Sequence, residues 1–164
     1  MKSRLSPLAF PIASITIVLC WLLFVLFFHN PTSQALFVLG NVIVGVSILL
    51  IVLAIVTLRR KGKPQEGEAF TATTVVAKRG VYSVVRHPLY LGWLLTYPAV
   101  MLVSQHWLIV VLGVIGIASI DQLTRTADEE LVEKFGIDYE TYIQEVPRLN
   151  IINGIFRKLN GGSR

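Results

Sequence analysis

The chain alternates between long apolar stretches and short polar ones, and this alternation predicts its elements. Two uncharged stretches, at about 8–28 and 35–58, are each long enough to cross a hydrocarbon core of ~30 Å as a helix rising ~1.5 Å per residue. Two shorter apolar stretches follow, at about 89–103 and 106–120. The pattern predicts an all-α, polytopic membrane protein with about four transmembrane helices, the third and fourth forming a short hairpin.

The polar segments complete this prediction. The first apolar stretch favours a retained span over a signal peptide, because it exceeds the usual ~7–15 residue core and no small-residue cleavage site follows it. Residues 59–88 predict a polar loop with a basic start. Residues 121–164 predict a helical tail that continues the fourth span to Gly136, adds a short helix at about 138–145 and frays over 160–164. We interpret residues 1–164 as one membrane domain.

The placement of the charges predicts the orientation in the membrane. All 15 Lys and Arg residues fall in the N-terminal segment, in the loop at 59–88 or in the tail at 121–164. The two loops on the opposite side contain none, so the positive-inside rule predicts that both termini are cytoplasmic. A net charge of +5 would also suit nucleic-acid binding, but this distribution favours a membrane face and no nucleic-acid partner.

Composition agrees with lipid as the solvent. The chain is 54% hydrophobic and 15% charged, whereas soluble domains carry about a quarter charged residues. The single cysteine, Cys20, lies in an apolar stretch and cannot form an internal disulfide, so we expect it to face lipid or to pack against a neighbouring helix. No metal-spaced His or Cys group is visible in the sequence, and we predict no metal site.

The first candidate site is the segment from Gly80 to Gly92, GVYSVVRHPLYLG. Pro88 suits the first turn of the third helix, where free backbone N–H groups and the positive end of the helix dipole lie. Arg86 and His87 stand beside this helix start, so together they predict a site for an anionic group such as a carboxylate. The alternative is interfacial anchoring, because Arg and Tyr side chains are common at membrane borders.

The second candidate site is the acidic triplet Asp128, Glu129 and Glu130, with the tyrosines Tyr139 and Tyr142 after it. Acidic side chains near a membrane can bind a cationic or hydroxyl-rich ligand. The alternatives are a solvated face of a helix for the acidic residues and a packing role for the two tyrosines.

The two segments together resemble the signatures of the isoprenylcysteine carboxyl methyltransferases and the phospholipid methyltransferases. The first signature is the run of Gly, Tyr, Arg-His-Pro, Tyr and Gly over residues 80–92. The second is the acidic helix followed by Phe135-Gly136, the two tyrosines and Val146-Pro147-Arg148. This chain has Val at position 81, where relatives commonly have Pro, and no further Pro directly after Arg148.

The resemblance implies S-adenosyl-L-methionine as cofactor and a lipophilic methyl acceptor that enters from the bilayer. It implies that Arg86 and His87, the candidate catalytic residues, hold the donor's carboxylate. The candidate cofactor-binding residues are Tyr82, Arg86, His87, Pro88, Tyr90, Gly92, Asp128, Glu129, Glu130, Tyr139 and Tyr142.

The acidic positions depart from the family pattern. Counted back from Phe135, the family's acidic pair falls on Ala127 and Asp128 rather than on Glu129 and Glu130. Either the helix register differs in this chain or Asp128 alone takes the place of the pair.

Three functions remain open at this point. The first is methyl transfer to an isoprenylcysteine-like carboxylate or to a lipid amine. The second is a non-catalytic protein that binds lipid or a partner, and the third is an NADPH-dependent membrane reductase of related helical framework. The membrane itself supplies lipids as partners in each case, and the sequence does not fix the oligomeric state.

Overall fold

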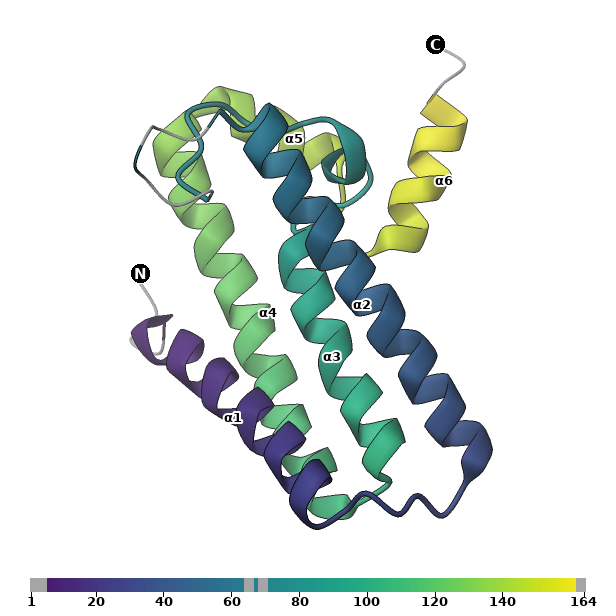
Figure 1. Cartoon of the computed structure of the whole chain (residues 1–164). Coiled ribbons are helices and arrows are strands. Elements are labelled where there is room, and N and C mark those ends of the chain that lie inside the picture. The colour runs from purple at the N-terminus through teal and green to yellow at the C-terminus, as the bar shows by residue number, and fades with distance from the viewer. Residues whose placement is uncertain (1–5, 64–66, 68–70, 162–164) are drawn as a thin grey trace. The chain divides into compact units, whose positions relative to one another are not determined.

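A computed structural model describes residues 6–63, 67 and 71–161 of the chain. Six α-helices and one 3₁₀ helix form this part, which contains no β-strand. The predicted all-α fold is therefore confirmed for the described residues (Figure 1). The helices are α1 (Ser6–Leu26), α2 (Gln34–Lys61), η1 (Gly80–Ser83), α3 (Pro88–Ser104), α4 (Trp107–Phe135), α5 (Ile137–Glu145) and α6 (Ile151–Gly161).

Three of these helices, α1, α2 and α4, are long and apolar enough to cross a membrane. A helix can do this because its backbone hydrogen bonds are satisfied within the helix. The helix α3 is also apolar but has only 17 residues. The apolar stretches thus all become helices, and the count of four spans stays a prediction.

The helix boundaries follow local chemistry. The helix α2 ends in the basic residues Arg59, Arg60 and Lys61, which suit the negative end of a helix dipole. The helix α3 begins at Pro88, as predicted. The helix α4 runs unbroken to Phe135, and Gly136 follows with φ +56°, a left-handed conformation that glycine adopts readily.

One prediction about the tail is confirmed and another needs correction. The continuation of the fourth apolar stretch into the charged segment is confirmed, because α4 runs for 29 residues in all. Asn160 and Gly161 do not fray but belong to α6, which the sequence analysis missed. The residues beyond Gly161 lie outside the described part.

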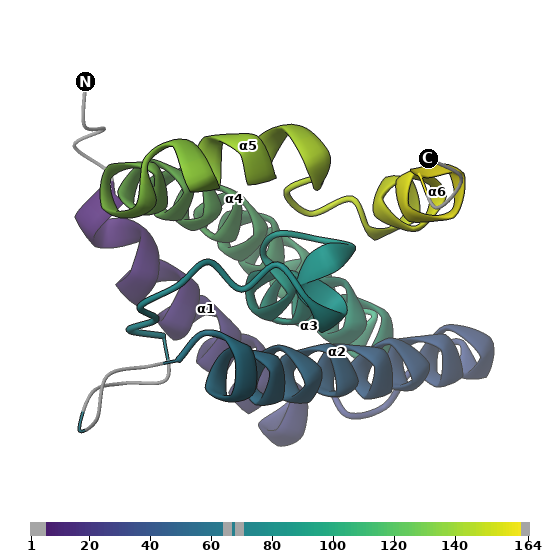
Figure 2. The ribbon, with the colours of Figure 1, turned by 90° about the horizontal axis from the view of Figure 1, so that it is seen from above.

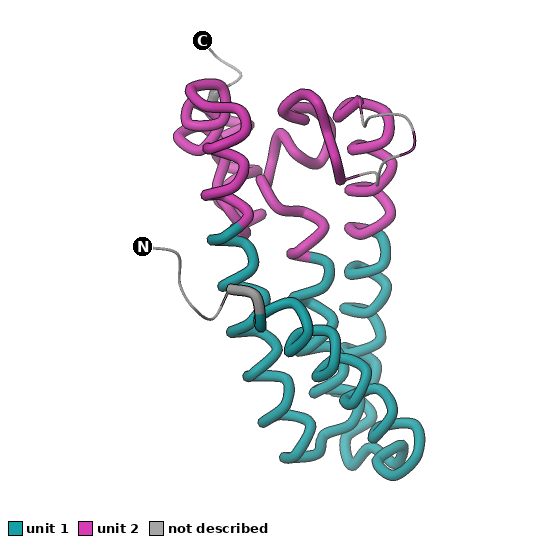
Figure 3. The backbone as a smooth tube through the Cα atoms, turned by 90° about the vertical axis from the view of Figure 1, so that its left-hand side faces the viewer, with its two compact units in different colours: residues 1–49, 92–126 teal, residues 50–91, 127–164 magenta. Residues whose placement is uncertain are grey.

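The structure divides into two compact units (Figure 3). Unit 1 comprises Met1–Leu49 and Gly92–Thr126, and unit 2 comprises Leu50–Leu91 and Ala127–Arg164. Because α2, α3 and α4 each contribute residues to both units, neither is a separate stretch of chain. The single membrane domain stays a prediction.

Unit 1 packs parts of α1, α2, α3 and α4 through an apolar core with a few internal hydrogen bonds. Cys20 is fully buried against Val100 and Ile109, so it packs between helices. The Tyr97 hydroxyl donates to the carbonyl of Ala13 (2.7 Å), and the Ser47 hydroxyl donates to the carbonyl of Gly92 (2.6 Å). Such bonds link apolar helices without leaving polar groups unpaired.

Unit 2 gathers the end of α2, η1, the start of α3, the end of α4, α5 and α6. One small core forms around Ala54, Ala77 and Tyr82. A second forms around Tyr139, Tyr142 and Val146. Both signature segments except Gly92 lie in this unit, and its cores hold them in place.

Candidate functional site

The Arg86–His87 segment is fixed first through its backbone. The Arg86 N–H donates to the carbonyl of Pro147 (3.0 Å), and the His87 N–H donates to the carbonyl of Arg148 (3.2 Å). These two bonds join the first signature segment to the end of the second. They determine where the two side chains begin.

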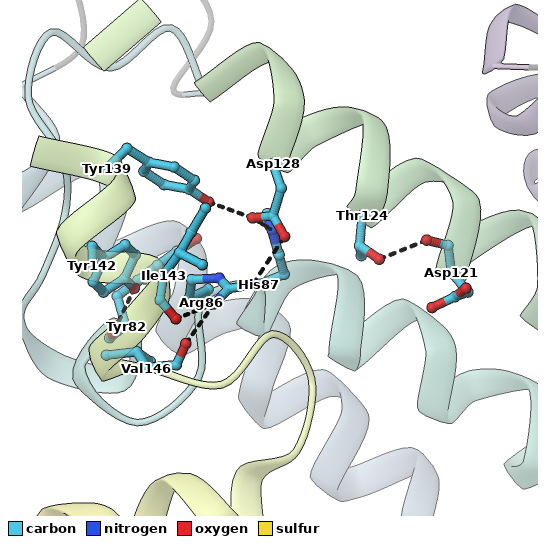
Figure 4. A network of polar contacts seen from close by, with 10 residues as sticks. All are labelled: Tyr82, Arg86, His87, Asp121, Thr124, Asp128, Tyr139, Tyr142, Ile143 and Val146. Atoms are coloured by element: carbon cyan, nitrogen blue, oxygen red, sulfur yellow. Dashed lines mark hydrogen bonds and ion pairs between the residues drawn. The ribbon is translucent and has the colours of Figure 1, made fainter. Parts of the chain in front are cut away.

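The Arg86 side chain is 8% exposed and reaches the end of α5 (Figure 4). Its Nη1 donates to the carbonyl oxygens of Ile143 (2.8 Å) and Val146 (2.7 Å). The last carbonyls of a helix lack partners within the helix and carry partial negative charge, so a guanidinium is well suited to this position. Arg86 therefore acts as a cap for the end of α5.

Asp128 is the centre of the site. Its Oδ2 accepts a hydrogen bond from Arg86 Nη2 at 3.0 Å, and its Oδ1 lies 2.8 Å from both His87 Nε2 and Tyr139 Oη. The adjacent guanidinium favours the ionised carboxylate, which can only accept hydrogen bonds, so Nε2 and Oη both donate. We call Asp128, Arg86, His87 and Tyr139 the Asp128 cluster.

The two tyrosines close the buried side of this cluster. Their rings meet edge to face with centroids 5.6 Å apart, and the Tyr142 hydroxyl donates to the carbonyl of Tyr82. Burial raises the pKa of both phenols, and for Tyr139 the neighbouring Asp128 charge raises it further. Both phenols therefore remain protonated donors at neutral pH.

The other predicted site residues lie around the cluster or apart from it. Pro88 is buried at the first position of α3, and the half-buried Tyr90 ring meets the His87 ring edge to face at 5.7 Å. Glu129 and Glu130 are exposed. Gly92 belongs to unit 1, where its carbonyl accepts from Ser47.

The positions of the predicted site residues show which member of the acidic triplet lies near Arg86 and His87. The predicted residues that the structure connects by hydrogen bonds are Tyr82, Arg86, His87, Asp128, Tyr139 and Tyr142. Asp128 is the member of the acidic triplet that contacts Arg86 and His87, whereas Glu129 and Glu130 point to solvent. Which of the two registers supplies the family's acidic pair stays a prediction.

The backbone partners of Arg86 could not be predicted from the sequence. The carbonyls of Ile143, Val146 and Pro147 carry no sequence signal, because every residue type presents the same oxygen. The one available signal was that the second signature ends next to the end of a short helix. The free carbonyls at a helix end favour a nearby cation.

The cluster has a defined remaining capacity for a ligand. The charges of Arg86 and Asp128 oppose each other, and Arg86 Nε is buried without a hydrogen-bond partner among the described residues. Asp128 accepts three hydrogen bonds of about four that a carboxylate can take. Arg86 uses three of its five N–H donors in these contacts, so the site keeps donor capacity on the guanidinium and about one acceptor position on Asp128. Within the described residues, no group of His, Cys, Asp and Glu side chains is arranged to hold a metal ion.

Comparison with known proteins identifies the family. Residues 35–136, more than half of the chain, match the phospholipid methyltransferase family, and this match includes Arg86, His87 and Asp128. No curated protein and no solved structure matches the chain. The apolar helices and this match agree in describing an integral membrane protein of a methyltransferase family. The chain belongs to the phospholipid methyltransferase family.

Proposed function

We propose that this protein transfers a methyl group from S-adenosyl-L-methionine to a lipophilic or amphipathic acceptor. The observation that carries the proposal is the Asp128 cluster, which joins the two signature segments of a methyltransferase family within one unit. A positively charged and a negatively charged side chain meet there, and each keeps some capacity for further hydrogen bonds.

The chemistry of this donor set fits S-adenosyl-L-methionine. Arg86 would hold an oxygen of its carboxylate through the unpartnered Nε, and the remaining acceptor position of Asp128 suits its ammonium group. When bound, the cofactor supplies a methyl group already activated on a sulfonium sulfur. The chain then needs to align the reactants and exclude water rather than supply strong acid–base chemistry.

The chain's own residues are arranged for those two tasks. His87 and Tyr139 fix the Asp128 carboxylate from two sides, so its orientation is set before any ligand arrives. His87, Pro88 and Tyr142 are buried and keep water from the inner side of the cluster. Tyr90, Glu129 and Glu130 are the more accessible polar groups and would contact the outer parts of the cofactor.

The two acceptor classes differ in their ionisation. A carboxylate acceptor is ionised at pH 7 and reacts without a base, whereas a lipid amine must first lose a proton. The His87 imidazole lies in the cluster, and its Nε2 is engaged by Asp128. Both acceptor classes belong in the test, which uses S-adenosyl-L-methionine labelled in its methyl group.

The experiment measures label transferred to lipid by the purified protein in nanodiscs. One set contains phosphatidylethanolamine and the other phosphatidylcholine with a prenylated cysteine. We expect transfer in one set, lost in Asp128→Asn and kept in Glu133→Gln, which neutralises an exposed carboxylate on the same helix. Transfer in neither set by folded protein that binds the cofactor would refute both acceptor classes.

A non-catalytic role is the second candidate, and one observation favours it. Arg86 and His87 already contact a carboxylate, that of Asp128, so the cluster is complete enough to serve as a structural link. Lipid binding without label transfer and without cofactor binding would support this function. The family match gives the reductase alternative no support.

The proposed topology places the cluster on the cytoplasmic side with both termini. Its support is the distribution of the 15 Lys and Arg residues, which avoids the segments between α1 and α2 and between α3 and α4. Labelling of single introduced cysteines in sealed vesicles with an impermeant reagent tests this orientation.

A further inference from the structure

The helix α6 carries an apolar surface that the structure leaves uncovered. Ile152, Ile155, Phe156 and Leu159 recur at the spacing of one helix face, and their exposed fractions run from 47% to 71%. We call these four side chains the apolar stripe of α6. Exposed apolar residues aligned on one face mark an interaction surface, unlike scattered ones.

The opposite side of α6 rests on the rest of unit 2. Gly154, about opposite the stripe, is buried against the backbone of Val84, two residues before Arg86. Lys158 Nζ donates to the Ser83 hydroxyl at 2.8 Å, and Arg157 Nη1 donates to the carbonyl of Gln144 at 3.1 Å. The exposed stripe therefore faces away from these contacts with unit 2. Figures 1 and 2 show the ribbon of α6, which follows α5 after a short loop.

The charges of α6 indicate the partner. Ile151–Gly161 contains two basic residues, Arg157 and Lys158, and no acidic residue. The Gln144 carbonyl and the Ser83 hydroxyl, to which they donate, are uncharged, so these hydrogen bonds do not neutralise the two positive charges. An apolar stripe flanked by basic residues is the pattern of a helix that lies in the interface of an anionic bilayer.

Two further facts favour the bilayer over a protein. Unit 2 already contains the end of α2, where exposed apolar residues such as Val52 and Val56 give way to Arg59, Arg60 and Lys61, so it reaches a membrane border. A stripe of four side chains is also small beside the ~800 Å² that each partner gives to a standard protein interface.

We propose that α6 is a membrane-interface helix whose apolar stripe inserts among the lipids and whose Arg157 and Lys158 bind anionic phospholipid headgroups. Because α6 packs on Val84 and Ser83, it ties the Arg86–His87 segment to the bilayer surface. This inference concerns the position of a helix and does not depend on methyl transfer.

The test places a spin label on the full-length protein in nanodiscs, either of phosphatidylcholine or of phosphatidylcholine with phosphatidylglycerol. Ile155→Cys puts the label in the stripe, and Asn153→Cys puts it outside the stripe on the same helix as the matched control. The unsubstituted chain gives the background, since its Cys20 is fully buried. Accessibility to oxygen, which is lipid-soluble, is compared with accessibility to a water-soluble nickel chelate.

We expect the Ile155→Cys label to favour oxygen and the Asn153→Cys label to favour the chelate. Anionic lipid should increase this contrast. Arg157→Gln or Lys158→Gln should each lower the ratio of molecules with an inserted α6 to molecules with an exposed α6 about fivefold. Equal chelate access at both positions in both lipids would overturn the proposal. So would dipolar broadening between labels, which would show a second copy covering the stripe.

Discussion

Asp128 Oδ2 lies 3.0 Å from Arg86 Nη2, and the same guanidinium caps the carbonyl end of α5 through Nη1. One arginine thus connects the last turns of α4 to the end of the following helix. The binding of a ligand by this arginine would therefore depend on the position of both helices.

Loss of the carboxylate should destabilise unit 2. Asp128→Asn keeps the shape of the side chain but leaves the buried Arg86 guanidinium without its counter-charge, which costs about 2–4 kcal/mol. Unfolding of the detergent-solubilised protein, followed by circular dichroism against denaturant, gives the difference in free energy. Glu133→Gln is the matched control and should change it by less than about 0.5 kcal/mol. Equal stability of the two variants would show that the Arg86–Asp128 pair is unimportant for folding.

The Tyr139 hydroxyl should act only through Asp128. Tyr139→Phe removes one hydrogen bond to the carboxylate and should cost about 1–2 kcal/mol of unfolding free energy. In a double-mutant cycle with Asp128→Asn, the two effects should fall short of additivity by about 0.5–1 kcal/mol or more. Full additivity would contradict a direct Tyr139–Asp128 interaction.

Gly154 should tolerate no side chain. A Cβ there would overlap the carbonyl oxygen of Val84, so Gly154→Ala must displace α6 or the segment before Arg86. We expect a loss of about 1–3 kcal/mol in unfolding free energy. Gly45→Ala, on α2, is the control, because no atom lies within 4 Å of its added Cβ and alanine favours helix. A stable Gly154→Ala variant with unchanged protease sensitivity of α6 would refute this packing.

Two glycines of α4 should differ in how well they tolerate substitution by alanine, because the added methyl group meets a different neighbour in each case. In Gly116→Ala the new methyl group meets the Tyr97 ring, which is held by its hydrogen bond to Ala13. In Gly113→Ala the methyl group meets the Met101 side chain, which has several rotatable bonds and can move. Gly116→Ala should therefore lower the unfolding free energy by about 1–3 kcal/mol and Gly113→Ala by clearly less. The opposite order would contradict the packing of unit 1.

The sequence predicted those features that depend on local chemistry. Uncharged apolar stretches gave helices, Pro88 began α3, and Gly136 followed the end of α4 with a positive φ. These outcomes need no knowledge of distant residues, because helix boundaries follow from backbone chemistry and side chains nearby.

Features that depend on tertiary contacts were harder to predict. The sequence indicated Arg86, His87 and the acidic triplet as candidates, but it did not show which carboxylate contacts the guanidinium. Three consecutive acidic residues differ only in the direction in which their side chains leave the helix. The helix α6 was missed because its stripe is short and Gly154 and Gly161 weaken the helical signal. The packing of Gly154 on Val84 explains why a glycine occupies that helix.

Calorimetric titration of the purified protein with S-adenosyl-L-methionine tests the central claim most directly, with S-adenosylhomocysteine as a second ligand. The proposal predicts saturable binding that weakens about tenfold or more in Arg86→Ala and Asp128→Asn, as expected for loss of a charge-assisted contact, and is unchanged in Glu133→Gln. Circular dichroism establishes that each titrated variant is folded. Absence of binding by the folded, unsubstituted protein would contradict the assignment of the Asp128 cluster as a cofactor site.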